Sequence, residues 1–127
     1  MKPGDVGPDR RRYRRFDIDL PIRYTRPEGL ASGYGRAMNV SEGGLLMYSP
    51  EQMDIGQHLK SKIFFLHGAE LDTIEMKACV IWTDLHLSEA WGDFRSGLKL
   101  TNISPNDMGK LKYVLTNLLR RPTYAAG

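Results

Sequence analysis

The strongest constraint on the fold of this sequence is a succession of short segments in which apolar and polar residues alternate. In FDIDLPIRY, residues 16–24, the alternation has the period of a strand and turns one set of side chains the same way: Phe16, Ile18, Leu20 and Ile22. A loop rich in glycine and proline follows at 27–35. Beyond it, the segments RAMNV and LLMYS read as two strands joined by a tight turn at SEGG.

Three more segments of the same kind follow: HLKSKIFFLH (58–67), TIEMKACVIWTDL (73–85) and RSGLKLTN (95–102). Short strands at this spacing are typical of an antiparallel barrel and not of alternating strands and helices. We therefore expect a mainly β fold with six or seven strands.

The C-terminal segment has the period of a helix. Ser104 is a candidate N-cap and Pro105 suits the first helical position. The apolar residues that follow fall on one face: Met108, Leu111, Leu115 and Leu118. We expect one amphipathic helix, at about 104–120, that packs on the barrel and completes a domain over 16–121. Arg120 and Arg121 read as charges at the negative end of the helix dipole.

Length and composition exclude several classes of protein. A chain of 127 residues fits one domain, and no apolar run is long enough to span a bilayer. The first nine residues carry glycine, proline and aspartate where a signal peptide has its apolar core, so we expect a cytoplasmic protein. Cys79 is the only cysteine and lies in an apolar run, which predicts a small buried residue. The three histidines lack metal-ligand spacing, so neither a metal nor a cofactor is expected.

The motif RRRYRR, residues 10–15, concentrates five arginines in a chain whose net charge is only +3. Residues 1–9 have no apolar periodicity, and like charges repel within the run, so we expect residues 1–15 to form a flexible basic arm. Such arms commonly bind nucleic acid or keep a protein in solution.

A second motif, NVSEGG (39–44), joins two predicted strands. Asn39 and Ser41 alternate, so a strand would turn them to one face with donors and acceptors side by side. Gly44 allows a ligand or another backbone to approach closely, or a positive φ. The same residues also suit a plain hairpin turn, which remains an alternative.

Together the two motifs resemble the PilZ domain, a bacterial receptor module for cyclic di-GMP (c-di-GMP). Arg11 and Arg15 match its Arg-x-x-x-Arg motif, and Asn39, Ser41 and Gly44 match its Asp/Asn-x-Ser-x-x-Gly motif. The resemblance extends over nearly the whole chain and implies a six-stranded antiparallel β-barrel with a C-terminal helix. It also implies a stand-alone receptor or adaptor that signals to an effector protein, which the sequence does not identify.

The resemblance implies further site residues. Trp82 is similar in position to a side chain that lies against a guanine in some members, although a core tryptophan is the alternative. Arg10 precedes the first motif, where a basic residue goes with two mutually intercalated ligands per chain. Asn39 stands where many members carry a carboxylate, so a hydrogen bond that it accepts from the ligand lacks charge assistance.

Guanidinium chemistry agrees with this interpretation, because arginine forks onto phosphate oxygens or guanine O6 and N7 and also stacks on bases. An enzyme is not expected: the closest candidate carboxylates, Asp17 and Asp19, read as solvated groups on a strand. Two rivals remain. One is a non-specific nucleic-acid binder that uses the arm, and the other is a PilZ-like adaptor that binds only protein.

Overall fold

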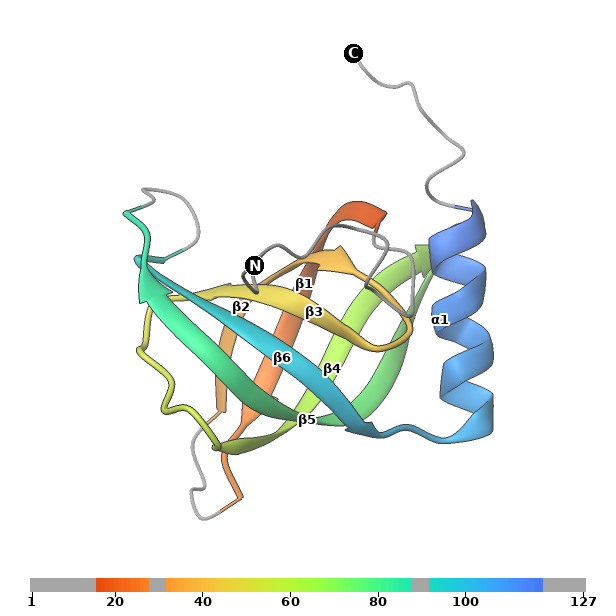
Figure 1. Ribbon diagram of the computed structural model, residues 1–127. Coiled ribbons are helices and arrows are strands. Elements are labelled where there is room, and N and C mark those ends of the chain that lie inside the picture. The colour runs from red at the N-terminus through yellow and green to blue at the C-terminus, as the bar shows by residue number, and fades with distance from the viewer. Residues whose placement is uncertain (1–15, 28–31, 88–91, 118–127) are drawn as a thin grey trace, which may run out of the picture.

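The computed structural model describes residues 16–27, 32–87 and 92–117. These ranges form six antiparallel strands and one helix: β1 (Phe16–Thr25), β2 (Ser32–Val40), β3 (Gly44–Ser49), β4 (His58–His67), β5 (Glu70–Leu85), β6 (Phe94–Asn102) and α1 (Pro105–Asn117). The strands follow the order β1-β2-β3-β6-β5-β4, and β4 pairs back with β1 to close a barrel (Figure 1). The predicted mainly β fold with a C-terminal helix is confirmed.

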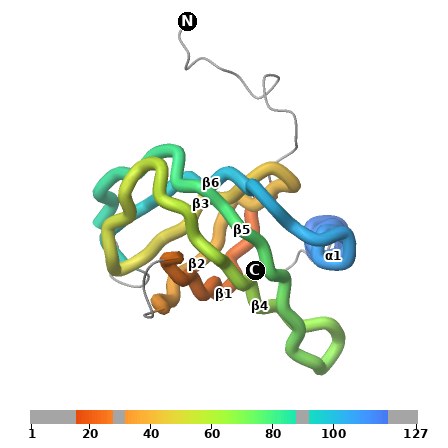
Figure 2. Tube along the Cα trace, turned by 90° about the horizontal axis from the view of Figure 1, so that it is seen from below, coloured from red at the N-terminus to blue at the C-terminus, as the bar shows by residue number. Residues whose placement is uncertain are grey.

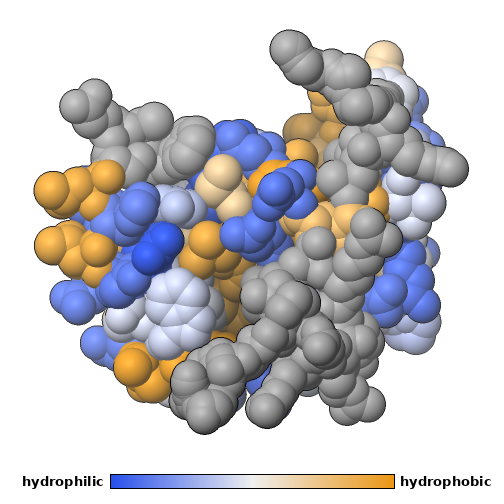
Figure 3. Space-filling view, turned by 45° about the horizontal axis from the view of Figure 1, so that its top comes forward, coloured by the Kyte–Doolittle hydropathy of each residue, from blue (hydrophilic) through white to orange (hydrophobic). Residues whose placement is uncertain are grey.

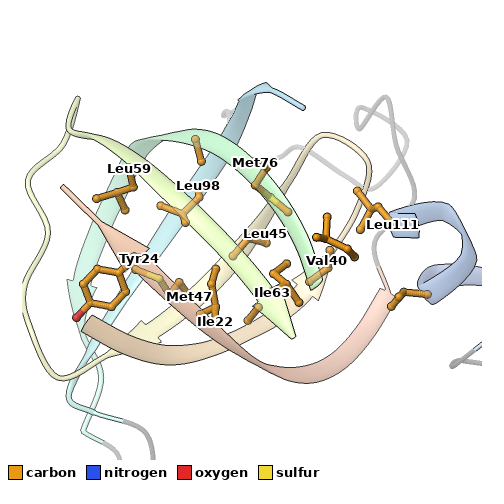
Figure 4. Packing of buried hydrophobic residues seen from close by; sticks show 14 of the residues in the cluster. Ile22, Tyr24, Val40, Leu45, Met47, Leu59, Ile63, Met76, Leu98 and Leu111 are labelled. Atoms are coloured by element: carbon orange, nitrogen blue, oxygen red, sulfur yellow. The ribbon is translucent and has the colours of Figure 1, made fainter. Parts of the chain in front are cut away.

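The core fills the barrel with alternate side chains from every strand. Ile22, Leu45, Ile63 and Leu98 are at most 2% exposed and point inward from four different strands (Figure 4). Strand alternation explains this arrangement, because successive residues point to opposite faces and only one face meets the interior. The partly buried Phe16, Ile18 and Leu20 pack against the same core, as the alternation in β1 predicted.

The helix stands on one side of the barrel, next to β5 (Figure 2). It adds three buried side chains to the core: Leu111, Val114 and Leu115. The predicted face included Leu118, which lies outside the described residues, and omitted Val114. Ser104 Oγ accepts a hydrogen bond from the Asp107 backbone N–H at 3.0 Å, which confirms the predicted N-cap. Arg120 and Arg121 also lie outside the described residues.

Two strands begin several residues before their predicted starts. Strand β2 begins at Ser32, so Gly33 and Gly35 lie in the strand and not in the expected loop. A Cβ at Gly33 would collide with the ring of Tyr24, and one at Gly35 would collide with the Tyr48 carbonyl. These glycines therefore allow a ring and a neighbouring backbone to approach closely, which local turn propensity does not reveal. Strand β5 begins at Glu70, three residues before the predicted start.

Two side chains differ from expectation. Cys79 is half-buried, because it lies between the inward-facing Ala78 and Val80 and so faces outward. Asp19 is not simply solvated, since its Oδ1 accepts a hydrogen bond from Arg36 Nε at 2.7 Å across the β1–β2 pair. The predicted arm, residues 1–15, lies outside the described residues.

Candidate functional site

Two adjoining hollows lie on the outside of the barrel where β1 begins. The larger has a volume of about 600 Å³ and is lined from β1, β2, β3, β5 and β6, with Asn39, Trp82 and Arg95 among its residues. The smaller, about 320 Å³, shares Asp17, Asn39 and Leu46 with it. On the face drawn in Figure 3, hydrophobic side chains are interspersed among hydrophilic ones. The larger hollow brings together two of the residues that the sequence singled out, Asn39 and Trp82.

Asn39 has an unusual backbone conformation near the end of β2. Its φ is +48°, and it is the one non-glycine residue with positive φ in the described ranges. Asparagine tolerates this left-handed conformation better than most residues because its short polar side chain can bond locally. Backbone geometry therefore restricts which residue types are favoured at position 39.

Ser41 is part of the β2–β3 turn. Its side chain is buried, and its Oγ accepts hydrogen bonds from the backbone N–H groups of Gly43 at 3.1 Å and Gly44 at 3.2 Å. The hydroxyl also donates to the Gly44 carbonyl at 3.2 Å. We expected Ser41 to share a strand face with Asn39. It does not, because β2 ends at Val40. These hydrogen bonds match the hairpin-turn alternative for this motif.

Gly44 pairs with Lys99 of β6 and has no positive φ. A Cβ at this position would collide with the carbonyl oxygen of Leu98. Of the reasons that the sequence left open for this glycine, the close approach of another backbone is the one found. Strand β6 lies directly beside Gly44, and the larger hollow is lined by Asn39 and not by this glycine.

Trp82 lies on the outer surface and is 39% exposed, so the core-tryptophan alternative is wrong. The register of the β5–β6 pair shifts between Val80 and Trp82. Val80 pairs with Leu98 and Trp82 with Gly97, so β5 has one extra residue here. This bulge lets both Ile81 and Trp82 project outward, which a regular strand would not allow. Both line the larger hollow.

Arg95 is a candidate that sequence reasoning missed. Its guanidinium lies 5.9 Å from the centre of the Trp82 ring, within cation–π range. Its Nε and Nη2 donate to the two carboxylate oxygens of Asp84 at 3.1 and 2.8 Å, and the bonds from Arg95 lower the pKa of that carboxyl. The pairing of Arg95 with Asp84 depends on the bulge, which the sequence pattern does not show.

Arg10, Arg11 and Arg15 lie outside the described residues, so their predicted ligand contacts stay predictions. In the part of the chain that is described, no cluster of three or more His, Cys, Asp or Glu residues could hold a metal ion. Over the same ranges no helix has the length and apolar character needed to cross a membrane.

The fold and its hollows define a small β-barrel domain with ligand-sized space beside a left-handed asparagine and an exposed tryptophan. The sequence profile of the PilZ domain matches residues 9–117, and the chain belongs to the PilZ family. A search of curated proteins found no sequence match.

Solved structures share the fold at low sequence identity. The Bacillus subtilis inhibitor of motility (MotI/DgrA) matches with a TM-score of 0.69 and 20% identity over 89% of this chain and 53% of its own. The PilZ domain of YcgR from Escherichia coli, solved with c-di-GMP, matches with a TM-score of 0.68 and 17% identity. The match covers 87% of this chain and 92% of the YcgR domain. The structure of YcgR from Escherichia coli in complex with c-di-GMP matches with a TM-score of 0.69 and 18% identity. That match covers 87% of this chain and 46% of the YcgR chain. This chain therefore spans about half the length of MotI and of YcgR.

Proposed function

We propose that this protein is a receptor for cyclic di-GMP whose basic arm closes over the larger hollow when the ligand binds. The new position of the arm would then be read by an effector protein. The proposal is of a receptor or adaptor and not of an enzyme. Family membership supports it, and so does the YcgR PilZ domain, which was solved with c-di-GMP on a similar fold.

The charge of the hollow is the observation that carries the proposal. Arg95 is neutralised by its two hydrogen bonds to Asp84, and Asp17 is the remaining charged group among the described residues of the lining. The described walls therefore offer an aromatic surface and polar groups but no surplus positive charge. A ligand with two phosphates needs cations, and the arginine arm is where the chain supplies them.

The place where the arm joins the barrel supports this proposal, in which the hollow supplies the aromatic and polar surface and the arm supplies the cations. Phe16 pairs with Val40, the residue after Asn39, so the chain enters the barrel beside the hollow. Arg15 is the preceding residue, and Arg11 is four residues further away, at most about 14 Å along an extended chain. Both arginines of the motif are within reach of a ligand held there.

The chemistry of each group suits part of a cyclic dinucleotide. Guanidinium groups of Arg11 and Arg15 would fork onto phosphates or guanine O6 and N7. Trp82 would stack on a guanine, an interaction typically worth about 1–3 kcal/mol. Asn39 would accept or donate a hydrogen bond at the base. The volume of about 600 Å³ falls in the range of ordinary ligand pockets.

Calorimetric titration with cyclic di-GMP tests the proposal. Arg11→Ala and Arg15→Ala should each weaken binding at least tenfold, because each removes charge-assisted contacts worth about 1.5–3 kcal/mol. Arg12→Ala is the matched control: it removes the same charge from the same arm but lies outside the motif, and it should change affinity less than threefold.

Three other results would overturn the proposal. Equal losses in all three variants would indicate attraction by net charge alone. Steep salt dependence with DNA and indifference to cyclic di-GMP would indicate the nucleic-acid binder. Absence of any nucleotide binding would leave the adaptor that binds only protein.

We propose two mutually intercalated ligands per chain, with Arg10 against the second molecule. Arg10→Leu should then shift the calorimetric stoichiometry from two towards one. A stoichiometry of one in the unmodified protein would refute this point and leave the site itself standing.

A further inference from the structure

A second group of cations lies on the outer face of β1, β4 and β5. Pairing across these strands places Arg23 opposite Lys62 and Lys60 opposite Lys77. All four alternate with inward-facing core residues, so their side chains share the outer face of the sheet. None of them lines the hollows beside Asn39.

Two like-charged pairs side by side do not help the barrel to fold. Side chains directly opposite each other on antiparallel strands lie about 4.5–5.5 Å apart at Cβ, and like charges there are destabilising. Among the described residues that line the space beside these cations, Glu75 is the one carboxylate, and it pairs with Lys62 at 3.4 Å. Within the described ranges, Arg23, Lys60 and Lys77 have no ion pair, which leaves a local surplus of positive charge.

The surface between these cations is concave. It forms a hollow of about 440 Å³ on the three strands, with a wall made by the chain that leaves β6 at Asn102 and continues to Ser104. Arg23 Nε is buried there without a hydrogen-bond acceptor. A buried donor without a partner costs free energy, and a bound anion is one way to satisfy it. We call this space the cationic hollow.

We propose that the cationic hollow binds a small anion that carries phosphate groups, at a site separate from that for cyclic di-GMP. Three uncompensated cations fit a multiply charged ligand such as a diphosphate group better than a single carboxylate. Arg23 would donate through its fork to phosphate oxygens, while Lys60 and Lys77 would act as point charges. The inference does not depend on the proposed function, because it uses none of the same residues.

Inorganic pyrophosphate is the probe, and titration is followed by calorimetry and by backbone amide NMR on the full chain. We expect saturable binding of one pyrophosphate per chain, with shifts concentrated in β1, β4 and β5. The Lys60→Gln/Lys77→Gln double variant should weaken binding at least tenfold. Lys112→Gln, a charge change on the exposed face of α1, is the control and should change affinity less than twofold.

The same variants separate a ligand site from a structural role. Without ligand, Lys77→Gln should raise Tm, because it removes the repulsion from Lys60, while it weakens pyrophosphate binding. Arg11→Ala and Arg15→Ala should leave pyrophosphate binding unchanged. The proposal is overturned by non-saturable binding, by equal losses in Lys112→Gln, or by shifts confined to residues 11–17 and 39–45.

A further experiment distinguishes the source of the phosphate. Sedimentation with vesicles of phosphatidylcholine and phosphatidic acid tests for a lipid headgroup. Sedimentation that is lost in the double variant would assign the site to a lipid phosphate. Pyrophosphate binding without sedimentation would assign it to a free phosphate compound. Failure of both would overturn the proposal.

Discussion

The indole ring of Trp82 occupies the space that a side chain would need at Gly97, its cross-strand neighbour on β6. Glycine at this position thus lets the ring approach the β6 backbone, on the wall of the larger hollow. Arg95, two residues before Gly97, then lies near the ring while Asp84 holds its guanidinium. The β5–β6 pair therefore fixes the place of the Trp82 ring and holds the charge of Arg95 against Asp84 at this wall.

Gly97→Ala should therefore push the Trp82 ring from its place and weaken cyclic di-GMP binding. Overpacking of this kind typically destabilises by about 1–3 kcal/mol. Gly109→Ala is the control, because a Cβ at Gly109 meets no atom within 4 Å and alanine favours a helix by about 0.5–1 kcal/mol. Urea unfolding and calorimetry measure both effects. Unchanged ligand affinity in Gly97→Ala would show that the ring position does not matter for binding.

Acid should destabilise the protein through two ion pairs. Hydrogen bonds from Lys110 and Arg95 lower the pKa values of Asp72 and Asp84 below their ordinary 3.8. Carboxyls with a lowered pKa in the folded state stabilise it above the unfolded pKa, and this contribution is lost as the pH falls through the folded pKa. We expect the urea midpoint to hold above about pH 4 and to fall below it.

The Asp72→Asn/Asp84→Asn double variant should flatten this acid dependence. Asp54→Asn is the matched control, because the Asp54 carboxylate makes no ion pair in the described ranges, and it should keep the steepness of the unmodified protein. Equal acid dependence in all three proteins would refute the assignment to these pairs.

The barrel was predictable because its period-2 pattern is local. Alternation in FDIDLPIRY and HLKSKIFFLH places the core side chains without knowledge of their partners. The helix was equally readable from Ser104, Pro105 and the apolar spacing. In contrast, the start of β2 depends on Tyr24 and Tyr48, which lie over Gly33 and Gly35 from other strands. Such approaches between distant segments leave no local signal.

The candidate site was predictable only in part, and on different grounds. Asn39 and Trp82 were found through a family resemblance, and the structure brings them to one hollow. Arg95 was missed because its position beside Trp82 follows from a bulge in β5 that shifts the pairing by one residue. The hydroxyl of Ser41 was expected at a strand face, but hydrogen bonding within the turn holds it.

Hydrogen exchange should detect closure of the arm. If ligand phosphates relieve repulsion among the five arginines, binding should add protection at residues 11–17 and 39–45. The rest of the barrel should change little, because its strands are fixed by core packing. Equal protection of the arm without cyclic di-GMP would refute the ordering mechanism and would leave the exposed face of the ligand as the signal.

The left-handed Asn39 allows affinity and stability to be separated. Asn39→Asp keeps a residue type that tolerates positive φ and offers a carboxylate, so a hydrogen bond accepted from guanine gains charge assistance. Charge-assisted bonds are roughly twice as strong as neutral ones, and a gain of about 1 kcal/mol corresponds to about fivefold tighter binding of cyclic di-GMP by calorimetry.

Two further variants at this position serve as controls. Asn39→Gly accepts the same φ without a side chain, so it should unfold at a urea concentration close to that of the unmodified protein but bind more weakly. Asn39→Ala should lose both affinity and about 1–2 kcal/mol of stability, because a Cβ without a polar group is strained at φ +48°. Should Asn39→Asp bind no more tightly than the unmodified protein, then repulsion from Asp17 and the ligand phosphates outweighs the hydrogen bond. If Asn39→Gly also binds as tightly as the unmodified protein, Asn39 contributes backbone geometry and not recognition of the base.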